Sequence, residues 1–428
     1  MKNTSKPTRL ARPSYQQALW HDLEMGMFIH WAPNVYQGLQ GDALTTPLTD
    51  INPSELDTDE WIQVAKDLGA KYIVMVAKHV GGFCIWQTST SEYSIRNTPW
   101  RQGKGDIMAD ISASCHRAGL KLGVYLSPRD DYFGANTGGI CSDPSRQTEY
   151  DAVYRQQLKE LLSCYGEICE VWFDGSSNCF VADILAQYAP QAVVFQSPQA
   201  SIRWVGNEDG MAHYPAWNSL SQADALTGKA TQAQSTPDGD AWLPLECDTT
   251  IRQDWFWSPD NHVTLKSVEK LMDIYYRSIG NGAVLILNAN PDDLGRIPAD
   301  DAQRARDFGD EIRRRFSHPV AVTAGKGQEL LLEFPKLHRI DHVVLQEDIN
   351  QGERVRQYSI TGFDGQKWRF VAQGTAIGHK RIESIRPVLL SKIRLTIERS
   401  VDQPQIRLLA VYGSLQSECD ADEVHKDI

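Results

Sequence analysis

Between residues 25 and 290, short apolar runs rich in strand-forming residues alternate with longer segments of helical periodicity. Strands separated by helices in this way form β/α units, in which the helices cover a parallel sheet. The runs predict strands at residues 25–31, 72–79, 122–127, 170–174, 192–196, 243–247 and 283–288. We therefore predict an α/β fold, a (β/α)8-like TIM barrel rather than a doubly wound sheet. Because the sequence shows only seven strands, we allow for an irregular barrel.

Amphipathic segments between these strands predict helices at residues 57–68, 106–117, 149–164 and 265–278. Asp57 is expected to start the first helix, because its carboxylate can accept the free N–H groups of the first turn. Gly69, Gly119 and Gly166 follow three of the segments, and glycine readily adopts the left-handed conformation that ends a helix.

After a basic helix at residues 300–316, the sequence changes to short strands joined by polar turns. This pattern predicts a small all-β domain of the sandwich type. We expect a catalytic barrel at residues 1–318 and a C-terminal β-sandwich at residues 319–428. Its predicted strands are residues 330–334, 342–346, 358–362, 368–374, 391–398 and 405–412.

Composition narrows the choice of partners and cofactors. The formal net charge of -12 and the pI near 5.4 offer no basic surface for nucleic acid or an anionic membrane, and no apolar stretch approaches the roughly 20 residues that span a bilayer. Residues 1–17 lack the apolar run of a signal peptide, so we expect a cytoplasmic protein. The absence of a basic surface favours a neutral substrate. The eight cysteines include no C-x-x-C pair, so we expect no zinc site and no cofactor; the oligomeric state stays open.

Polar residues at the ends of the predicted strands are the candidates for chemistry, because the active site of such a barrel lies where strands pass into loops. Asp174 follows Val-Trp-Phe and precedes Gly175, which predicts a catalytic carboxylate, although a helix cap would fit the same position. Glycoside hydrolysis is one reaction in which such a carboxylate acts, and it needs a second carboxylate. Glu208 and Glu246 are both candidates, and for each a surface or ion-paired role is the alternative.

His30 and His79 each follow an apolar strand and could bond sugar hydroxyls as donor or acceptor, although a satisfied structural histidine is the commoner case. A metal-dependent hydrolase with these two as ligands is a rival hypothesis, but no H-E-x-x-H spacing supports it. Two or three of the tryptophans near these groups are expected to form sugar-stacking walls, and the others to lie in the core. The candidates are Trp31, Trp86, Trp172, Trp204, Trp255 and Trp257.

A series of motifs resembles the α-L-fucosidases of glycoside hydrolase family 29 in order and spacing across residues 20–316. They are Gly-Met-Phe-Ile-His-Trp at 26–31, Ala-Lys-His at 77–79 with Gly-Phe-Cys-Ile-Trp at 82–86, Tyr-Ser-Ile at 93–95 with Asn-Thr-Pro-Trp at 97–100, Gly-Lys-Gly-Asp at 103–106, Leu-Lys-Leu-Gly-Val-Tyr-Leu-Ser-Pro at 120–128, and Glu-Val-Trp-Phe-Asp-Gly at 170–175.

The resemblance implies a retaining exo-α-L-fucosidase that acts on fucosylated oligosaccharides, with Asp174 as nucleophile. By analogy with the subgroup that carries Arg-Trp-Val-Gly-Asn-Glu, here at residues 203–208, it makes Glu208 the acid/base and Glu246 the reserve. A retaining mechanism predicts roughly 5 to 5.5 Å between the two carboxyl groups. The substrate-binding residues implied are His30, Trp31, His79, Trp86, Tyr125, Trp172, Arg252 and Trp255.

The chain departs from the family pattern in two places. It has His79-Val80-Gly81-Gly82 where the family commonly has His-His-Asp-Gly, and Arg129 where a tryptophan usually follows Ser-Pro. A missing donor to a sugar hydroxyl would cost on the order of 1 to 3 kcal/mol, which keeps two alternatives open: a related retaining exo-glycosidase such as an α-L-galactosidase, and an inactive sugar-binding protein. The C-terminal domain resembles the family's β-sandwich, with a discoidin-like run at residues 364–368.

Overall fold

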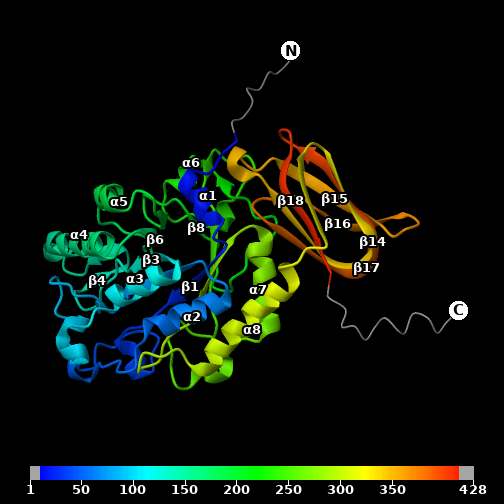
Figure 1. Cartoon of the computed structure of the whole chain (residues 1–428). Helices are drawn as coiled ribbons and strands as arrows, with labels where there is room; N and C mark the ends of the chain where they lie inside the picture. The colour runs from blue at the N-terminus through cyan, green and yellow to red at the C-terminus, as the bar shows by residue number, and fades with distance from the viewer. Residues whose placement is uncertain (1–9, 414–428) are drawn as a thin grey trace, which may run out of the picture. The chain divides into compact units, whose positions relative to one another are not determined.

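The computed structural model describes residues 10–413 (Figure 1). The chain divides into two compact units, one of Met1–Asp310 with Ile349–Gly352 and one of Glu311–Asp348 with Glu353–Ile428. This division falls inside helix α8 (Ala299–Phe316), whereas the boundary predicted from the sequence, between residues 318 and 319, follows the end of that helix. Residues 1–9 and 414–428 of the two predicted domains lie outside the described part.

The first unit is built on an eight-stranded parallel barrel, as predicted (Figure 1). Neighbouring strands follow the order β7-β6-β3-β2-β1-β12-β11-β8, and a parallel bridge between Phe195 and Ile202 connects the region of β7 to that of β8. The strand missed by the prediction is β8, whose two residues are too few to form an apolar run. The strands are β1 (Met25–Ile29), β2 (Tyr72–Lys78), β3 (Lys121–Leu126), β6 (Ile168–Trp172), β7 (Val193–Phe195), β8 (Arg203–Trp204), β11 (Leu245–Thr250) and β12 (Val284–Asn288).

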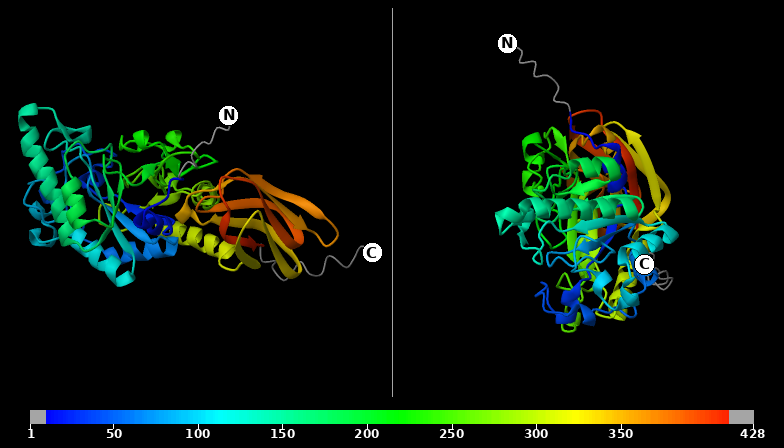
Figure 2. Two further views of the ribbon diagram at one scale, coloured as in Figure 1. Left: turned by 90° about the horizontal axis from the view of Figure 1, so that it is seen from above. Right: turned by 90° about the vertical axis from the view of Figure 1, so that its left-hand side faces the viewer.

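Helices lie outside the barrel strands in the views of Figures 1 and 2. The predicted helix signals are confirmed: the Asp57 side chain accepts the N–H of Asp59 at the start of α2, and Gly69 and Gly119, with φ of 96° and 70°, end α2 and α3 in the left-handed conformation. The helices of this unit are α1 (Tyr15–His21), α2 (Thr58–Leu68), α3 (Ile107–Ala118), α4 (Gln147–Cys164), α5 (Ala182–Tyr188), α6 (Gln222–Ala225) and α7 (Val268–Arg277), followed by α8.

The barrel interior is filled by alternate side chains of the strands, because successive residues of a strand point to opposite faces. Large aromatic and β-branched side chains close the space below the loops that follow the strands. Two short antiparallel ribbons lie in those loops, β4 (Ala135–Asn136) with β5 (Ile140–Cys141), and β9 (Ser219–Leu220) with β10 (Ala241–Trp242). The interior core includes Phe28, Tyr72, Val74, Val76, Tyr125, Trp172, Val193, Phe195, Ile202, Val284 and Ile286.

The second unit is a six-stranded antiparallel sheet in the order β13-β18-β14-β17-β15-β16. The long strands β14 and β17 pair with each other, and their pairing shifts register between Glu333 and His338. Two predicted strands, 330–334 and 342–346, are parts of β14, and β13 was not predicted. The strands are β13 (Ala321–Lys326), β14 (Glu329–Glu347), β15 (Val355–Phe363), β16 (Trp368–Gly374), β17 (Arg381–Ser400) and β18 (Gln405–Tyr412).

None of the helices in residues 10–413 combines the length and the apolar character that a membrane crossing requires. The cysteines within the same range are free thiols, most of them buried. Cys419 lies outside the described residues.

Candidate active site

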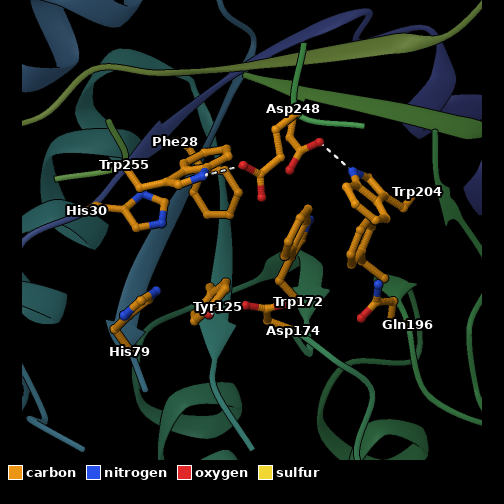
Figure 3. Close-up of a pocket in the computed structure, with 12 residues that line it drawn as sticks. Phe28, His30, His79, Tyr125, Trp172, Asp174, Gln196, Trp204, Asp248 and Trp255 are labelled. Carbon is orange, nitrogen blue, oxygen red and sulfur yellow. Dashed lines mark hydrogen bonds between the residues drawn. The ribbon is translucent and has the colours of Figure 1, made fainter. Parts of the chain in front are cut away.

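A pocket opens at the carboxyl ends of the barrel strands, where this fold places its reactive groups. It encloses about 150 Å³, and cavities of about that volume can hold a single six-membered ring. Apolar aromatic walls surround a few polar groups, which is the usual composition of a small-molecule site. The lining residues are Phe28, His30, His79, Tyr125, Trp172, Asp174, Phe195, Gln196, Trp204, Glu208, Asp248 and Trp255 (Figure 3).

Asp174 lies two residues beyond the end of β6, and Gly175 turns the chain away from the pocket with φ of 77°. The hydroxyl of Tyr125 donates a hydrogen bond of 2.9 Å to Oδ2 of Asp174. Solvent reaches the carboxylate through the pocket, yet the surrounding protein raises its pKa above the ordinary value for aspartate. The negative charge of Glu208 raises the pKa further, whereas the Tyr125 hydrogen bond lowers it.

Glu208 follows β8 in a loop, and its exposed carboxylate is held at the pocket wall by the indole of Trp255. Nε1 of Trp255 donates a hydrogen bond of 3.0 Å to Oε2 of Glu208. Because the Glu208 charge acts on Asp174, the two carboxylates belong to the same site, and both remain accessible to a bound molecule.

His30 and His79 supply the neutral polar groups. Nδ1 of His30 lies 2.8 Å from Oδ1 of Asn288, and the His79 ring stacks on Tyr125 with centroids 5.7 Å apart. Burial and the neighbouring His79 lower the pKa of His30; burial and the positive charge of Arg129 lower the pKa of His79 to about 4. Both imidazoles are therefore neutral near pH 7 and can donate and accept hydrogen bonds with hydroxyl groups.

Trp172 forms an apolar wall between these groups (Figure 3). Its ring stacks on Phe195 with centroids 3.5 Å apart and planes 4° from parallel. The Phe28 ring packs edge-to-face with it, with centroids 5.0 Å apart and an angle of 76° between the planes. Flat aromatic surfaces of this kind can pack against the apolar face of a sugar ring.

Four predicted site residues lie outside the pocket lining. Nε1 of Trp31 donates to the carbonyl of Asp292, and Nε1 of Trp86 donates to Glu160. Arg252 is buried in an ion pair with Asp301, with 2.9 Å between Nε and Oδ2, and Glu246 lies inside the barrel beneath Trp172. Of the four, Glu246 contacts a lining residue directly, because it accepts the hydrogen bond from Trp172. Of the aromatic candidates, Trp204 lines the pocket and Trp257 does not.

Sequence reasoning did not assign four lining residues to the substrate site: Phe28, Phe195, Gln196 and Asp248. Asp248 is the most informative, because Nε1 of Trp204 donates a hydrogen bond of 2.6 Å to its Oδ1. Burial raises the pKa of Asp248 well above the ordinary range. Its signal in the sequence was its position two residues after Glu246, on the same face of β11 and one layer nearer the strand end.

The His79-Val80-Gly81-Gly82 segment has a local steric reason for its two glycines. A Cβ atom on Gly81 would lie 2.6 Å from Cβ of Asp42, and a Cβ on Gly82 would lie 2.3 Å from Oδ1 of Asp130. Gly82 also has φ of 93°, which other residues rarely adopt. A larger side chain at position 81 is therefore excluded unless the loop carrying Asp42 moves, and one at position 82 is excluded by Asp130 and by the backbone conformation.

Within residues 10–413, no group of three or more His, Cys, Asp or Glu side chains is arranged to hold a metal ion.

Known proteins match the chain over most of its length. The sequence model of the family described as Alpha-L-fucosidase matches residues 36–314. Alpha-L-fucosidase 1 of Arabidopsis thaliana is 30% identical, with 94% of this chain and 88% of the plant protein covered. The family model covers the barrel strands from β2 to β12, and β1 lies before its first matched residue.

Solved structures show the same fold. A putative alpha-L-fucosidase from Bacteroides thetaiotaomicron superposes with a TM-score of 0.87 at 34% identity, over 94% of this chain and 99% of the bacterial one. A family 29 fucosidase from Ruminococcus gnavus, solved in complex with fucose, has a TM-score of 0.83 at 25% identity, over 97% of both chains. The chain therefore belongs to the α-L-fucosidase family, glycoside hydrolase family 29.

Proposed function

We propose that the protein is a retaining exo-α-L-fucosidase that releases terminal fucose from fucosylated oligosaccharides by double displacement, with Asp174 as nucleophile and Glu208 as acid/base. The observation that carries the assignment is the accessibility of these two carboxylates within one pocket. Glu246, the reserve candidate for the acid/base, is fully buried, and both of its oxygens accept hydrogen bonds from protein donors, Tyr72 and Trp172.

In the first step, an oxygen of Asp174 attacks the anomeric carbon while the bond to the leaving oxygen breaks and Glu208 gives that oxygen its proton. In the second step, Glu208 takes a proton from water, the water oxygen bonds to the anomeric carbon, and the bond to Asp174 breaks. Two displacements at the same carbon retain its configuration. The products are fucose and the shortened glycan, and both carboxyl groups return to their starting states.

The side chains around these carboxylates suit a neutral sugar. His30 and His79, both uncharged near pH 7 for the reasons given above, can bond ring hydroxyls as donors or acceptors. Trp172 and Trp255 supply apolar surface on two sides of the pocket. Tyr125 holds the nucleophile in place through its hydrogen bond to Asp174.

The test is hydrolysis of 4-nitrophenyl α-L-fucoside and a fucosylated oligosaccharide by the wild type, Asp174→Ala and Glu208→Ala, with and without azide. Asp174→Ala should lose turnover and, with azide, form β-fucosyl azide, because azide replaces the nucleophile directly. Glu208→Ala should form the α-azide, because azide then attacks the glycosyl-enzyme. Asp209→Ala, which alters the neighbouring exposed carboxylate, is the matched control and should retain activity.

The wild type also decides the identity of the sugar. Val80 and Gly81 stand where the family commonly has His and Asp, and this departure is the reason to compare 4-nitrophenyl α-L-galactoside with the fucoside. A higher kcat/KM for the galactoside than for the fucoside would make L-galactose the preferred sugar. Fucose binding without any turnover would indicate an inactive sugar-binding protein.

A further inference from the structure

The barrel interior beneath the pocket contains two buried glutamates that the proposed reaction does not use. Glu170, Trp172 and Asp174 alternate along β6 and its extension, so their side chains lie on the same face. Trp172 lines the pocket, and its Nε1 donates a hydrogen bond of 2.8 Å to Oε2 of Glu246 on β11. A carboxyl group therefore holds the pocket wall from below.

This hydrogen bond restrains Trp172 in a way that its aromatic neighbours do not. Phe195 and Tyr125 stack on the ring, with centroids 3.5 and 5.9 Å away. Stacking fixes the plane of an aromatic ring but leaves offset positions within that plane close in energy. The bond from Nε1 is directional, so Glu246 determines where the indole lies along the floor of the site.

Glu246 is itself held from several directions. The hydroxyl of Tyr72 donates a hydrogen bond of 2.9 Å to Oε1 of Glu246, and Nε1 of Trp20, in α1, donates one of 2.8 Å to Oε2 of Glu170. Both glutamates are fully buried. The Trp20 bond thus connects helix α1 to Glu170, and the Tyr72 bond connects β2 to Glu246.

The two carboxyl groups lie close enough for the charge of Glu170 to affect the pKa of Glu246. Burial raises the pKa of Glu170 to about 7, and burial together with the charge of Glu170 raises the pKa of Glu246 well above the ordinary range. A negative charge on Glu170 therefore disfavours a negative charge on Glu246. Apolar side chains in such a position often give equal or greater stability than a buried polar group, so stability alone does not account for this pair.

We propose that Glu246, supported by Glu170 and Tyr72, is a positioning residue that holds the Trp172 indole beneath the sugar and so aligns the anomeric carbon with Asp174. The inference rests on the proposed function, since it assigns Trp172 to the sugar-binding wall.

The test compares Glu246→Leu, Glu246→Gln, Trp172→Phe and the double variant Glu246→Leu with Trp172→Phe. Leucine removes the acceptor for Nε1, so kcat/KM should fall about ten- to a hundredfold while the thermal midpoint is unchanged or higher. Glutamine keeps an acceptor for Nε1 of Trp172, and its NH2 group can donate to the Tyr72 hydroxyl oxygen once that hydroxyl no longer donates to residue 246. This variant should stay within about threefold of the wild type. In the Trp172→Phe background, Glu246→Leu should have no further effect, because the N–H that it acts through is absent.

Equal losses in the Leu and Gln variants would overturn the proposal, as would full activity in Glu246→Leu or losses that multiply in the double variant. If Glu246→Leu does not fold, Tyr72→Phe takes its place, since it removes one support of Glu246 without altering the pocket lining, and a severalfold loss that disappears in the Trp172→Phe background is expected. Fucose affinity, followed by tryptophan fluorescence, is measured in parallel. Absence of turnover in the wild type would contradict the fucosidase assignment, whereas affinities that follow the same pattern would still support the positioning role.

Discussion

Asp174 shows how one side chain acquires its properties from a few neighbours. In the reaction proposed above its carboxylate must be ionised to attack the sugar, but the surrounding protein disfavours the charge and raises its pKa. Glu208 acts in the same direction through its own charge, and Tyr125 opposes both through a hydrogen bond to the ionised form. The balance among these neighbours determines the pH at which the nucleophile becomes active.

Substitution of Tyr125 by phenylalanine tests this balance. The hydrogen bond favours the ionised carboxylate, so its loss raises the pKa of Asp174, and the acidic limb of kcat/KM should move to higher pH. A hydrogen bond to a charged group contributes about 1.5 to 3 kcal/mol, which corresponds to a shift of roughly one to two pH units. The measurement is the pH profile for 4-nitrophenyl α-L-fucoside, with Tyr132→Phe as the control. An unchanged or lowered limb would contradict the prediction.

At the scale of elements, the end of β2 is fastened to its surroundings by a buried ion pair. Nζ of Lys78 lies 2.9 Å from Oδ2 of Asp130 in the loop after β3, with side-chain exposures of 0% and 5%. The rings of Tyr150 and Tyr154 in α4 lie 5.5 and 5.4 Å from the same ammonium group. These contacts hold one strand, one loop and one helix together directly behind the pocket histidine that follows Lys78.

Removal of one partner of the Lys78–Asp130 pair should lower the free energy of unfolding much more than removal of both partners. Asp130→Ala leaves a buried ammonium without its counter-ion and should lower the free energy of unfolding by about 3 to 5 kcal/mol. The double variant Lys78→Met with Asp130→Leu should recover most of that loss. Chemical denaturation measures both.

The exposed ion pair between Arg117 and Asp59 is the control for this experiment. Disruption of that pair by Asp59→Ala should leave the thermal midpoint unchanged, because exposed pairs contribute little. A loss as small for Asp130→Ala as for Asp59→Ala would show that the Lys78 pair does not stabilise the barrel.

At the scale of the whole molecule, the pocket is assembled within the first unit from strands that are far apart in the chain. The barrel also buries acidic groups in its interior, and their protons couple its stability to pH. Burial raises the pKa of Glu170 from the ordinary value of 4.5 to about 7 in the folded state. Between these two values the folded chain retains a proton that the unfolded chain has lost, so this contribution to stability decreases as pH rises.

Glu170→Gln should remove that dependence. Relative to the variant, the wild type should lose stability as pH is raised from about 5 to about 7, and the difference should level off above pH 7. Thermal unfolding at several pH values measures it, with Glu167→Gln as the control because Glu167 is exposed and precedes the same strand. A difference between wild type and Glu170→Gln that is independent of pH would contradict the buried-proton explanation.

The sequence by itself determined the barrel, most of its strand and helix positions, and the candidate residues at the strand ends. These features depend on local patterns: strand alternation, helix caps such as Asp57, and glycines such as Gly69 that end helices. The resemblance of consecutive motifs to a known family added the pairing of Asp174 with Glu208 and the sugar-binding role of His30 and His79. Those four residues line one pocket in the structure.

Only the tertiary structure decided which neighbours of these residues face the pocket. His30 and Trp31 are adjacent in the chain just after β1, but only His30 lines the pocket. Glu246 and Asp248 share a face of β11, yet one lies beneath Trp172 and the other in the pocket wall. The depth of a side chain depends on which strands and rings pack around it, and these come from distant parts of the chain that no local pattern can specify.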